Sequence, residues 1–197
     1  MAKNTKARIL DAALEIFARD GYAGTNIKDI ADSVGIVKSA LYRHFDSKED
    51  IWNAVQDTMI DYYDGRFGSV DKLPGIPQSA DELYEMTIHM LDFTLNDKKV
   101  ILMRRILHTE QFRDERVRNL ASKYFLYDTE AIFTKVFEEM MKNGCMKKGD
   151  PAVLALSYTA PVTVLIHLCD REPDKKPEAL EKAQKFIRQF IETYGIK

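Results

Sequence analysis

Apolar residues recur three and four positions apart along most of this chain, and that spacing predicts helices. No stretch shows the sustained alternation of apolar and polar residues that a half-buried strand requires. The sequence therefore predicts an all-α fold. The expected helices cover residues 5–20, 27–34, 38–44, 47–67, 79–95, 98–108, 114–143, 151–169 and 179–194.

The stretch from Ile27 to Lys48, IKDIADSVGIVKSALYRHFDSK, predicts two short helices joined by a tight turn. The first helix has one apolar face, and Gly35 follows it, where a helix end favours a left-handed residue. On the second helix Leu41 faces inward beside Phe45, which leaves polar side chains outside. A short helix with an apolar anchor and outward donors suits recognition in a DNA major groove.

The first three expected helices form a small three-helix bundle with one shared core. That core is expected to contain Phe17, Ile30, Leu41 and Phe45. Ser47 opens the fourth helix, and the acidic Asp50 three positions later completes a capping box. Trp52 follows on this helix. We expect it to pack against the first three helices rather than touch DNA, because tryptophan is usually largely buried.

A loop is predicted at residues 68–78, GSVDKLPGIPQ, which contain two prolines and two glycines. The fourth helix precedes this loop and is expected to join two domains. The predicted division gives a helix-turn-helix domain at residues 1–47 and a second helical domain at residues 48–197.

The run at 151–169 contains no Asp, Glu, Lys or Arg, and its length would allow it to span a bilayer. Pro161 and several hydroxyl side chains argue against a membrane-bound interaction protein, so we expect a helix buried against protein on most sides. The last helix, 179–194, carries a continuous apolar stripe opposite a charged face. Both stripes could pack inside one monomer, but together they exceed the apolar surface that soluble monomers usually expose.

The net charge of the chain is −2, so a DNA-binding surface would have to be local. Residues 38–48 carry three cations against one anion, and Lys3, Lys6 and Arg8 add positive charge near the start. A footprint this modest suits a small module that needs a second copy to bind tightly.

Two cysteines, Cys145 and Cys169, provide no disulfide framework, and no secretory signal precedes the first helix, so we expect a cytoplasmic protein. His167 lies two positions before Cys169, on a different helix face, and we expect no metal site there. The chain has no P-loop, G-x-S-x-G or H-E-x-x-H motif. We therefore expect no catalytic residues and no cofactor. A small helical enzyme or a ligand-binding protein without DNA regulation is the weaker alternative.

Residues 5–52 resemble the DNA-binding domain of the TetR family of bacterial transcriptional regulators. The matching signals are FARDGY at the end of the first helix, then T-x-I-x-D-I-A, then G-I-x-K-x-x-L-Y-x-H-F-x-S-K-E-D. The resemblance covers about a quarter of the chain, and the rest resembles the family only as a helical block of suitable length. It implies a homodimeric repressor that binds a palindromic operator in double-stranded DNA and is released by a small-molecule effector.

The resemblance also implies individual DNA contacts. Arg and Lys pair with guanine acceptors, and an alanine methyl can meet a thymine methyl. Tyr42 could instead brace Leu41 and Phe45 as a half-buried ring. Val37 stands where the family usually has Ser or Thr, and the missing hydroxyl cap costs about 1 kcal/mol or less. The implied phosphate contacts are Thr25, Tyr42, His44 and Lys48, and the implied base contacts are Lys38, Ser39, Ala40 and Arg43.

In TetR-like proteins the last two helices form a four-helix bundle with those of a second copy, and the two apolar stripes described above fit that use. The expected interface residues are Val153, Leu156, Val164, Leu168, Phe186, Ile187, Phe190 and Ile191.

Met and Tyr side chains in the middle helices suit an adaptable pocket for a small apolar or aromatic effector. By resemblance, the bound effector would shift the fourth helix and change the spacing of the two recognition helices. The pocket candidates are Met86, Met90, Phe93, Met103, Tyr124, Tyr127, Tyr158 and Thr159.

Overall fold

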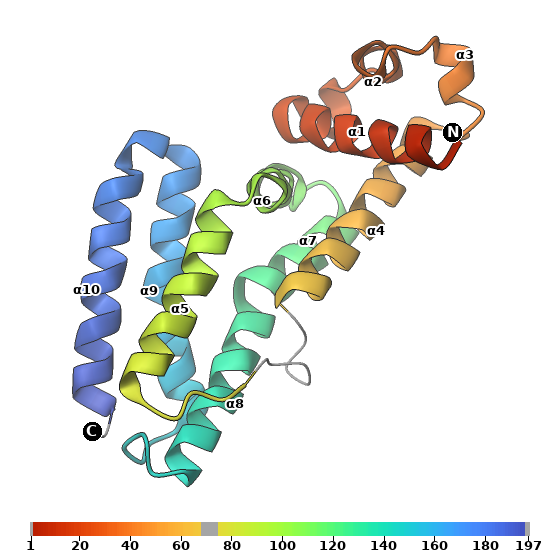
Figure 1. The fold of residues 1–197 in the computed structure, drawn as a ribbon. Helices are drawn as coiled ribbons and strands as arrows, with labels where there is room; N and C mark the ends of the chain where they lie inside the picture. The colour runs from red at the N-terminus through yellow and green to blue at the C-terminus, as the bar shows by residue number, and fades with distance from the viewer. Residues whose placement is uncertain (1, 68–74, 196–197) are drawn as a thin grey trace. The chain divides into compact units, whose positions relative to one another are not determined.

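The protein is all-α: a computed structural model describes residues 2–67 and 75–195, and within those ranges no strand forms. Residues 68–74 of the predicted loop lie outside the described residues. The helices are α1 (Ala2–Gly24), α2 (Ile27–Val34), α3 (Lys38–Leu41), α4 (Lys48–Phe67), α5 (Ala80–Asn96), α6 (Lys98–Glu110), α7 (Glu115–Ser122), α8 (Asp128–Lys142), α9 (Pro151–Arg171) and α10 (Lys176–Tyr194) (Figure 1). A π-helical segment at Lys123–Tyr127 and a 3-10 turn at Pro173–Lys175 complete the described helical structure.

Packing divides the chain into two compact units. Unit 1 contains Met1–Arg66 and Lys98–Ala121, and unit 2 contains Phe67–Asp97 and Ser122–Lys197. The helix-turn-helix therefore packs together with α4, α6 and α7. The division into functional domains after residue 47 stays a prediction, and it differs from this division by packing.

Unit 1 is built around α1, which packs against both α2 and α6. The four core residues predicted for the three-helix bundle are all buried. Trp52 is buried as well, with its ring against Phe17 at a centroid distance of 4.9 Å and against Tyr22 at 5.3 Å. The prediction that Trp52 packs in the core is confirmed.

Side-chain caps and left-handed glycines mark the helix ends of unit 1. The Asn26 side chain accepts from Lys28 N at 2.9 Å at the start of α2, and Gly35 ends that helix at φ 73°. Ser47 Oγ accepts from Asp50 N at 3.0 Å, which caps α4 as expected. Gly21, one residue past the end expected for the first helix, is left-handed at φ 71° and produces a kink inside α1.

The single helix expected at 114–143 is instead α7, the π-helical segment and α8. A π turn inserts an extra residue, so it shifts the apolar stripe by about one position. Tyr124 is buried, but Tyr127 and Ala131, which would continue the stripe, are exposed. The buried positions resume at Ile132 and Phe133.

Unit 2 packs α9 against α8 and α10, and α5 against α10 and α9. Figure 1 shows α5, α9 and α10 side by side. The core of the unit is aromatic: Tyr158 contacts Phe137 at a centroid distance of 5.5 Å and Phe190 at 4.6 Å.

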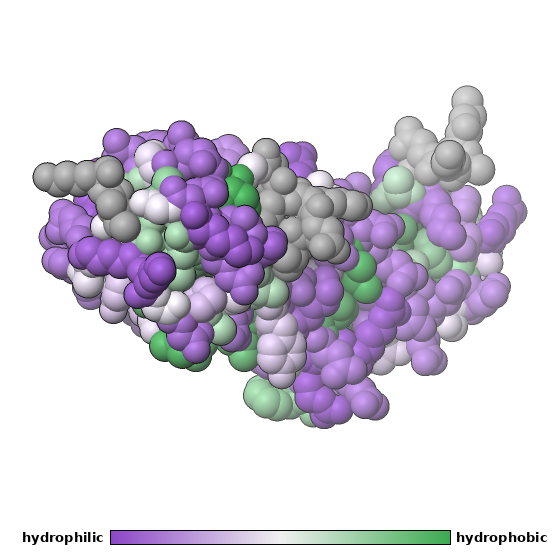
Figure 2. Space-filling model, turned by 90° about the horizontal axis from the view of Figure 1, so that it is seen from below, coloured by the Kyte–Doolittle hydropathy of each residue, from purple (hydrophilic) through white to green (hydrophobic). Residues whose placement is uncertain are grey.

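Helix α9 begins where the sequence predicts, with Asp150 Oδ1 accepting from Ala152 N and Val153 N. It continues through Pro161 to Arg171. The expectation that α9 is buried on most sides is wrong, because only 28% of its most apolar window is buried. By length and composition alone this helix could cross a membrane, a test that core helices of soluble proteins also pass. The face seen in Figure 2 is predominantly hydrophilic, with hydrophobic residues in small patches.

Candidate nucleic-acid interface

The turn between α2 and α3 has the tight geometry that the sequence predicts. Gly35 is left-handed at φ 73° and ψ 35°, and Ile36 N donates to Ala31 O at 3.0 Å. Val37 follows in an extended conformation without a side-chain cap, as expected for a residue that lacks a hydroxyl. Glycine suits this turn because the left-handed region is costly for other residues.

Helix α3 is shorter than expected, because it ends at Leu41 instead of His44. The chain continues in tighter turns, with Arg43 N donating to Ala40 O and His44 N donating to Leu41 O. These bonds span three residues instead of four, which draws the chain in as Phe45 enters the core. We refer to Lys38–His44 as the recognition segment.

Most of the predicted DNA-contacting side chains lie at the surface of the recognition segment. Lys38, Ser39, Tyr42 and Arg43 are exposed, whereas Ala40 and His44 are half-buried. The Lys38 ammonium lies 5.8 Å from the centre of the Tyr42 ring, so the two side chains share one patch. The segment therefore presents guanidinium, ammonium and hydroxyl groups together, which can donate to base edges and phosphates.

Thr25 and Lys48 make contacts inside unit 1. The Thr25 side chain is buried, and its hydroxyl donates to Gly21 O at 2.7 Å, so it does not offer the predicted phosphate contact. Lys48 Nζ donates to Thr25 O at 2.7 Å and lies 4.5 Å from the centre of the Tyr22 ring. Lys48 remains half-buried.

Two cations near the amino terminus support the same region. The Arg8 guanidinium donates to Val34 O at 2.7 Å, at the end of α2. Lys6 Nζ lies 5.0 Å from the centre of the Phe45 ring, beside the recognition segment. The sequence analysis included both residues in the local positive charge but predicted no contact for either. Their partners lie more than 20 residues away in the sequence.

The Tyr22 ring lies between Trp52 and the Lys48 ammonium. Burial raises the pKa of the Tyr22 phenol, and the negative charges of Glu49 and Asp114 raise it further. Tyr22 is therefore neutral at physiological pH, and its ring is an uncharged platform for Lys48.

None of the depressions found among the described residues is lined by all eight residues predicted to form an effector pocket. Met103 belongs to unit 1 and the other seven to unit 2. Tyr124, Tyr158 and Thr159 are buried in packed protein, and Met86, Met90 and Phe93 are half-buried. The eight assignments stay a prediction.

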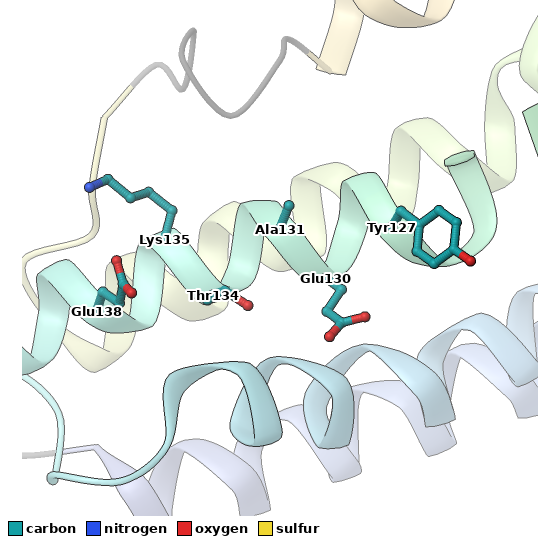
Figure 3. A pocket seen from close by; sticks show the side chains of 6 residues that line it. All are labelled: Tyr127, Glu130, Ala131, Thr134, Lys135 and Glu138. Atoms are coloured by element: carbon teal, nitrogen blue, oxygen red, sulfur yellow. The ribbon is translucent and has the colours of Figure 1, made fainter. Parts of the chain in front are cut away.

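Two open depressions occur in the described part of unit 2. The first, of about 450 Å³, follows one exposed face of the π-helical segment and α8 (Figure 3). Of the predicted pocket residues it includes Tyr127; the lining is Tyr127, Glu130, Ala131, Thr134, Lys135 and Glu138. The second, of about 360 Å³, lies between α5 and α10 beside Tyr84 and Arg188, and contains none of the predicted pocket residues.

The predicted dimer residues fall into two groups. Val153, Leu156 and Val164 are exposed on α9, at 59%, 45% and 62%. In contrast, Ile187 and Phe190 are 0% and 6% exposed because they pack inside the core of unit 2, so they are not available to a partner as predicted. Leu168, Phe186 and Ile191 are half-buried.

A family model described as bacterial regulatory proteins, tetR family, matches residues 9–55. The HTH-type transcriptional regulator AcrR of Shigella flexneri is 31% identical over 120 residues, which is 58% of this chain and 53% of AcrR. The biofilm operon icaADBC HTH-type negative transcriptional regulator IcaR of Staphylococcus aureus is 46% identical over 57 residues, which is 29% of this chain and 31% of IcaR. The matched segments thus span about half of the first relative and about a third of the second.

The fold also matches solved structures across both units. SmeT of Stenotrophomonas maltophilia, solved in complex with triclosan, superposes with a TM-score of 0.75 at 18% identity, covering 98% of this chain and 93% of SmeT. This likeness extends the fold assignment beyond residues 9–55. The family model and the curated relatives agree that residues 9–55 are similar to the tetR family of bacterial regulatory proteins.

Proposed function

We propose that this protein is a cytoplasmic, homodimeric transcriptional repressor that binds a palindromic operator and releases it on binding a small apolar or aromatic effector. The observation that carries the proposal is the recognition segment. There Lys38 and Ser39 are exposed on α3, which follows a left-handed turn, and Arg43 is exposed in the tight turns directly after α3. Such a segment fits the major groove, where these groups can read base edges.

The proposal that the repressor is a dimer rests on α9. One helical face of α9 exposes Val153, Leu156, Ala160 and Val164, at offsets of three and four residues. No charged residue interrupts this face between positions 151 and 169. A second copy related by two-fold symmetry would cover it, and two copies would double the number of base pairs read.

The proposal of effector release rests on the family and on the chemistry of unit 2. SmeT, a repressor with the same fold, was solved with triclosan bound. Unit 2 carries many Met, Phe and Tyr side chains, which suit apolar or aromatic ligands. In the proposed mechanism the effector shifts α4, whose amino-terminal end carries Lys48, and so changes the spacing of the two recognition segments.

The test compares Arg43→Ala with Arg118→Ala in the full-length protein. Arg43 is exposed on the recognition segment, whereas Arg118 is exposed on α7 and pairs with Glu115 at 3.8 Å. We expect Arg43→Ala to lose about 1–3 kcal/mol of discrimination between an operator and a scrambled duplex, and Arg118→Ala to keep it. Equal behaviour of the two variants, with the wild-type preference retained in both, would contradict the assignment of Arg43 as a base reader.

A further inference from the structure

The turn that joins α6 to α7 carries two acidic side chains directed at the DNA-binding helices of unit 1. Glu110, the last residue of α6, is only 3% exposed, and its Oε1 accepts from the backbone N of Tyr22 at 3.1 Å. The Arg113 guanidinium lies beside it, with Nη1 at 3.9 Å from Glu110 Oε1. A buried carboxylate needs hydrogen-bond donors to offset lost hydration, and here the backbone of α1 supplies one.

Gly21 makes this approach possible. It is left-handed at φ 71°, and a Cβ at this position would lie 2.7 Å from Glu110 Oε1. The kink interrupts the regular hydrogen bonding of α1, so the N–H of Tyr22 needs an acceptor from elsewhere. Glu110 provides that acceptor across 88 residues of sequence.

Asp114, four residues after Glu110, accepts hydrogen bonds from α4 and α7. Its Oδ2 accepts from Trp52 Nε1 at 2.7 Å, and its Oδ1 accepts from Val117 N at 3.1 Å, which caps α7. Trp52 lies in the second turn of α4 and packs on the Phe17 and Tyr22 rings. Both oxygens of one carboxylate therefore fix the position of α4 against α7.

From these two carboxylates a chain of contacts leads to the helix-turn-helix. The Tyr22 ring supports the Lys48 ammonium, and Lys48 donates to Thr25 O. The Thr25 hydroxyl donates to Gly21 O, and the neighbouring residue Asn26 caps α2. The segment that enters α2 and the start of α4 flank the recognition segment, and each is attached to the α6–α7 turn.

We propose that Glu110 and Asp114 are positioning residues for operator binding. They touch no base or phosphate; they hold the two ends of the helix-turn-helix so that Lys38 and Arg43 keep one orientation. This inference rests on the proposed function, and it adds that the α6–α7 turn sets how selectively the domain reads DNA.

The test uses three substitutions in the full-length protein. Glu110→Ala removes the acceptor, Glu110→Gln keeps an oxygen in the same place, and Glu115→Ala removes an exposed acidic side chain from the same turn as a control. For each variant we would measure the affinity for operator and for scrambled duplex, at a temperature where that variant is fully folded. Amide hydrogen exchange at residues 22–44 and the emission of Trp52, the single tryptophan, report the geometry without DNA.

We expect Glu110→Ala to lower the ratio of operator to scrambled affinity by about tenfold or more, with faster exchange at residues 22–44. Glu110→Gln and Glu115→Ala should remain near wild type. A folded Glu110→Ala protein that keeps the wild-type ratio, even with a lower melting temperature, would make Glu110 merely structural and overturn the inference.

Asp114→Ala gives an independent second reading. It should lower the same ratio and shift the emission of Trp52, because the indole loses its acceptor. An unchanged ratio in a folded Asp114→Ala protein would overturn the proposal for this residue. If the wild-type protein itself shows no preference between duplexes, the proposed function fails, and this inference about operator binding fails with it.

Discussion

The phenol oxygen of Tyr158 lies 2.8 Å from Thr87 Oγ1 inside the aromatic core of unit 2. The Thr87 hydroxyl donates its proton to Leu83 O at 2.8 Å, so the Tyr158 phenol is the donor between the two. Burial raises the pKa of Tyr158, and the hydrogen bond to Thr87 offsets only part of that rise. Tyr158 is thus a neutral, buried side chain, and its role in an effector pocket stays a prediction.

This pairing predicts a loss of stability at alkaline pH. The pKa of Tyr158 is higher in the folded than in the unfolded chain. Its contribution is therefore fully present below about pH 10, the unfolded value, and is lost as the pH rises towards the folded value. Above about pH 10 the melting temperature of the wild-type protein should thus fall more steeply with pH than that of Tyr158→Phe. Parallel curves for the two proteins would contradict the buried phenol.

Two left-handed glycines provide a matched comparison of backbone strain and steric contact. The Cβ that Gly35→Ala adds would have no neighbouring atom within 4 Å. This substitution should therefore lower the free energy of unfolding by only about 1–2 kcal/mol, the cost of a left-handed backbone at alanine. Gly21→Ala has the same backbone strain and also places Cβ 2.7 Å from Glu110 Oε1. We expect the larger loss in Gly21→Ala, measured by denaturant unfolding. Equal losses would mean that Glu110 moves away without cost.

The exposed face of α9 predicts a dimer that a single charge can break. Leu156→Glu places a carboxylate in the centre of this face and should weaken self-association by at least about tenfold, because an unpaired buried charge is costly. Gln189→Glu adds the same charge to the exposed, polar face of α10 and should leave association unchanged. Sedimentation of both variants over a range of concentrations measures the effect. A monomeric wild-type protein at micromolar concentration would refute the dimer.

Lys48 is expected to contribute to DNA binding through a phosphate rather than a base. Lys48→Ala should weaken binding to all duplexes alike and reduce the slope of log affinity against log salt by about 1. Because Lys48 also donates to Thr25 O, the variant should melt at a lower temperature than Arg43→Ala. A change in base preference in Lys48→Ala, with an unchanged salt slope, would assign it to base reading instead.

Local signals predicted the amino-terminal elements well. Helix α2 has the expected ends because Asn26 and Gly35 act within a few residues of sequence. The sequence did not predict the length of α3, because Phe45 draws the chain inward after Leu41. It also did not predict the π turn, which shifts the apolar stripe around Tyr124 by about one position. Apolar stripes also do not reveal their partner, which is why Phe190 lies in the core whereas Leu156 is exposed.

The contacts that hold the DNA-binding helices were beyond sequence reasoning. Glu110 and Tyr22 are 88 residues apart, and Trp52 and Asp114 are 62 apart. No local pattern marks an acidic residue at a helix end as the acceptor for a distant backbone N–H.

Selection of bound duplexes from a random pool tests the central claim most directly. The wild-type protein, at physiological salt and without effector, should enrich a palindrome whose half-sites lie about one helical turn apart. Arg43→Ala should enrich a sequence that is relaxed at the positions nearest that side chain. A pool that remains random after repeated rounds with the folded wild-type protein would contradict the account.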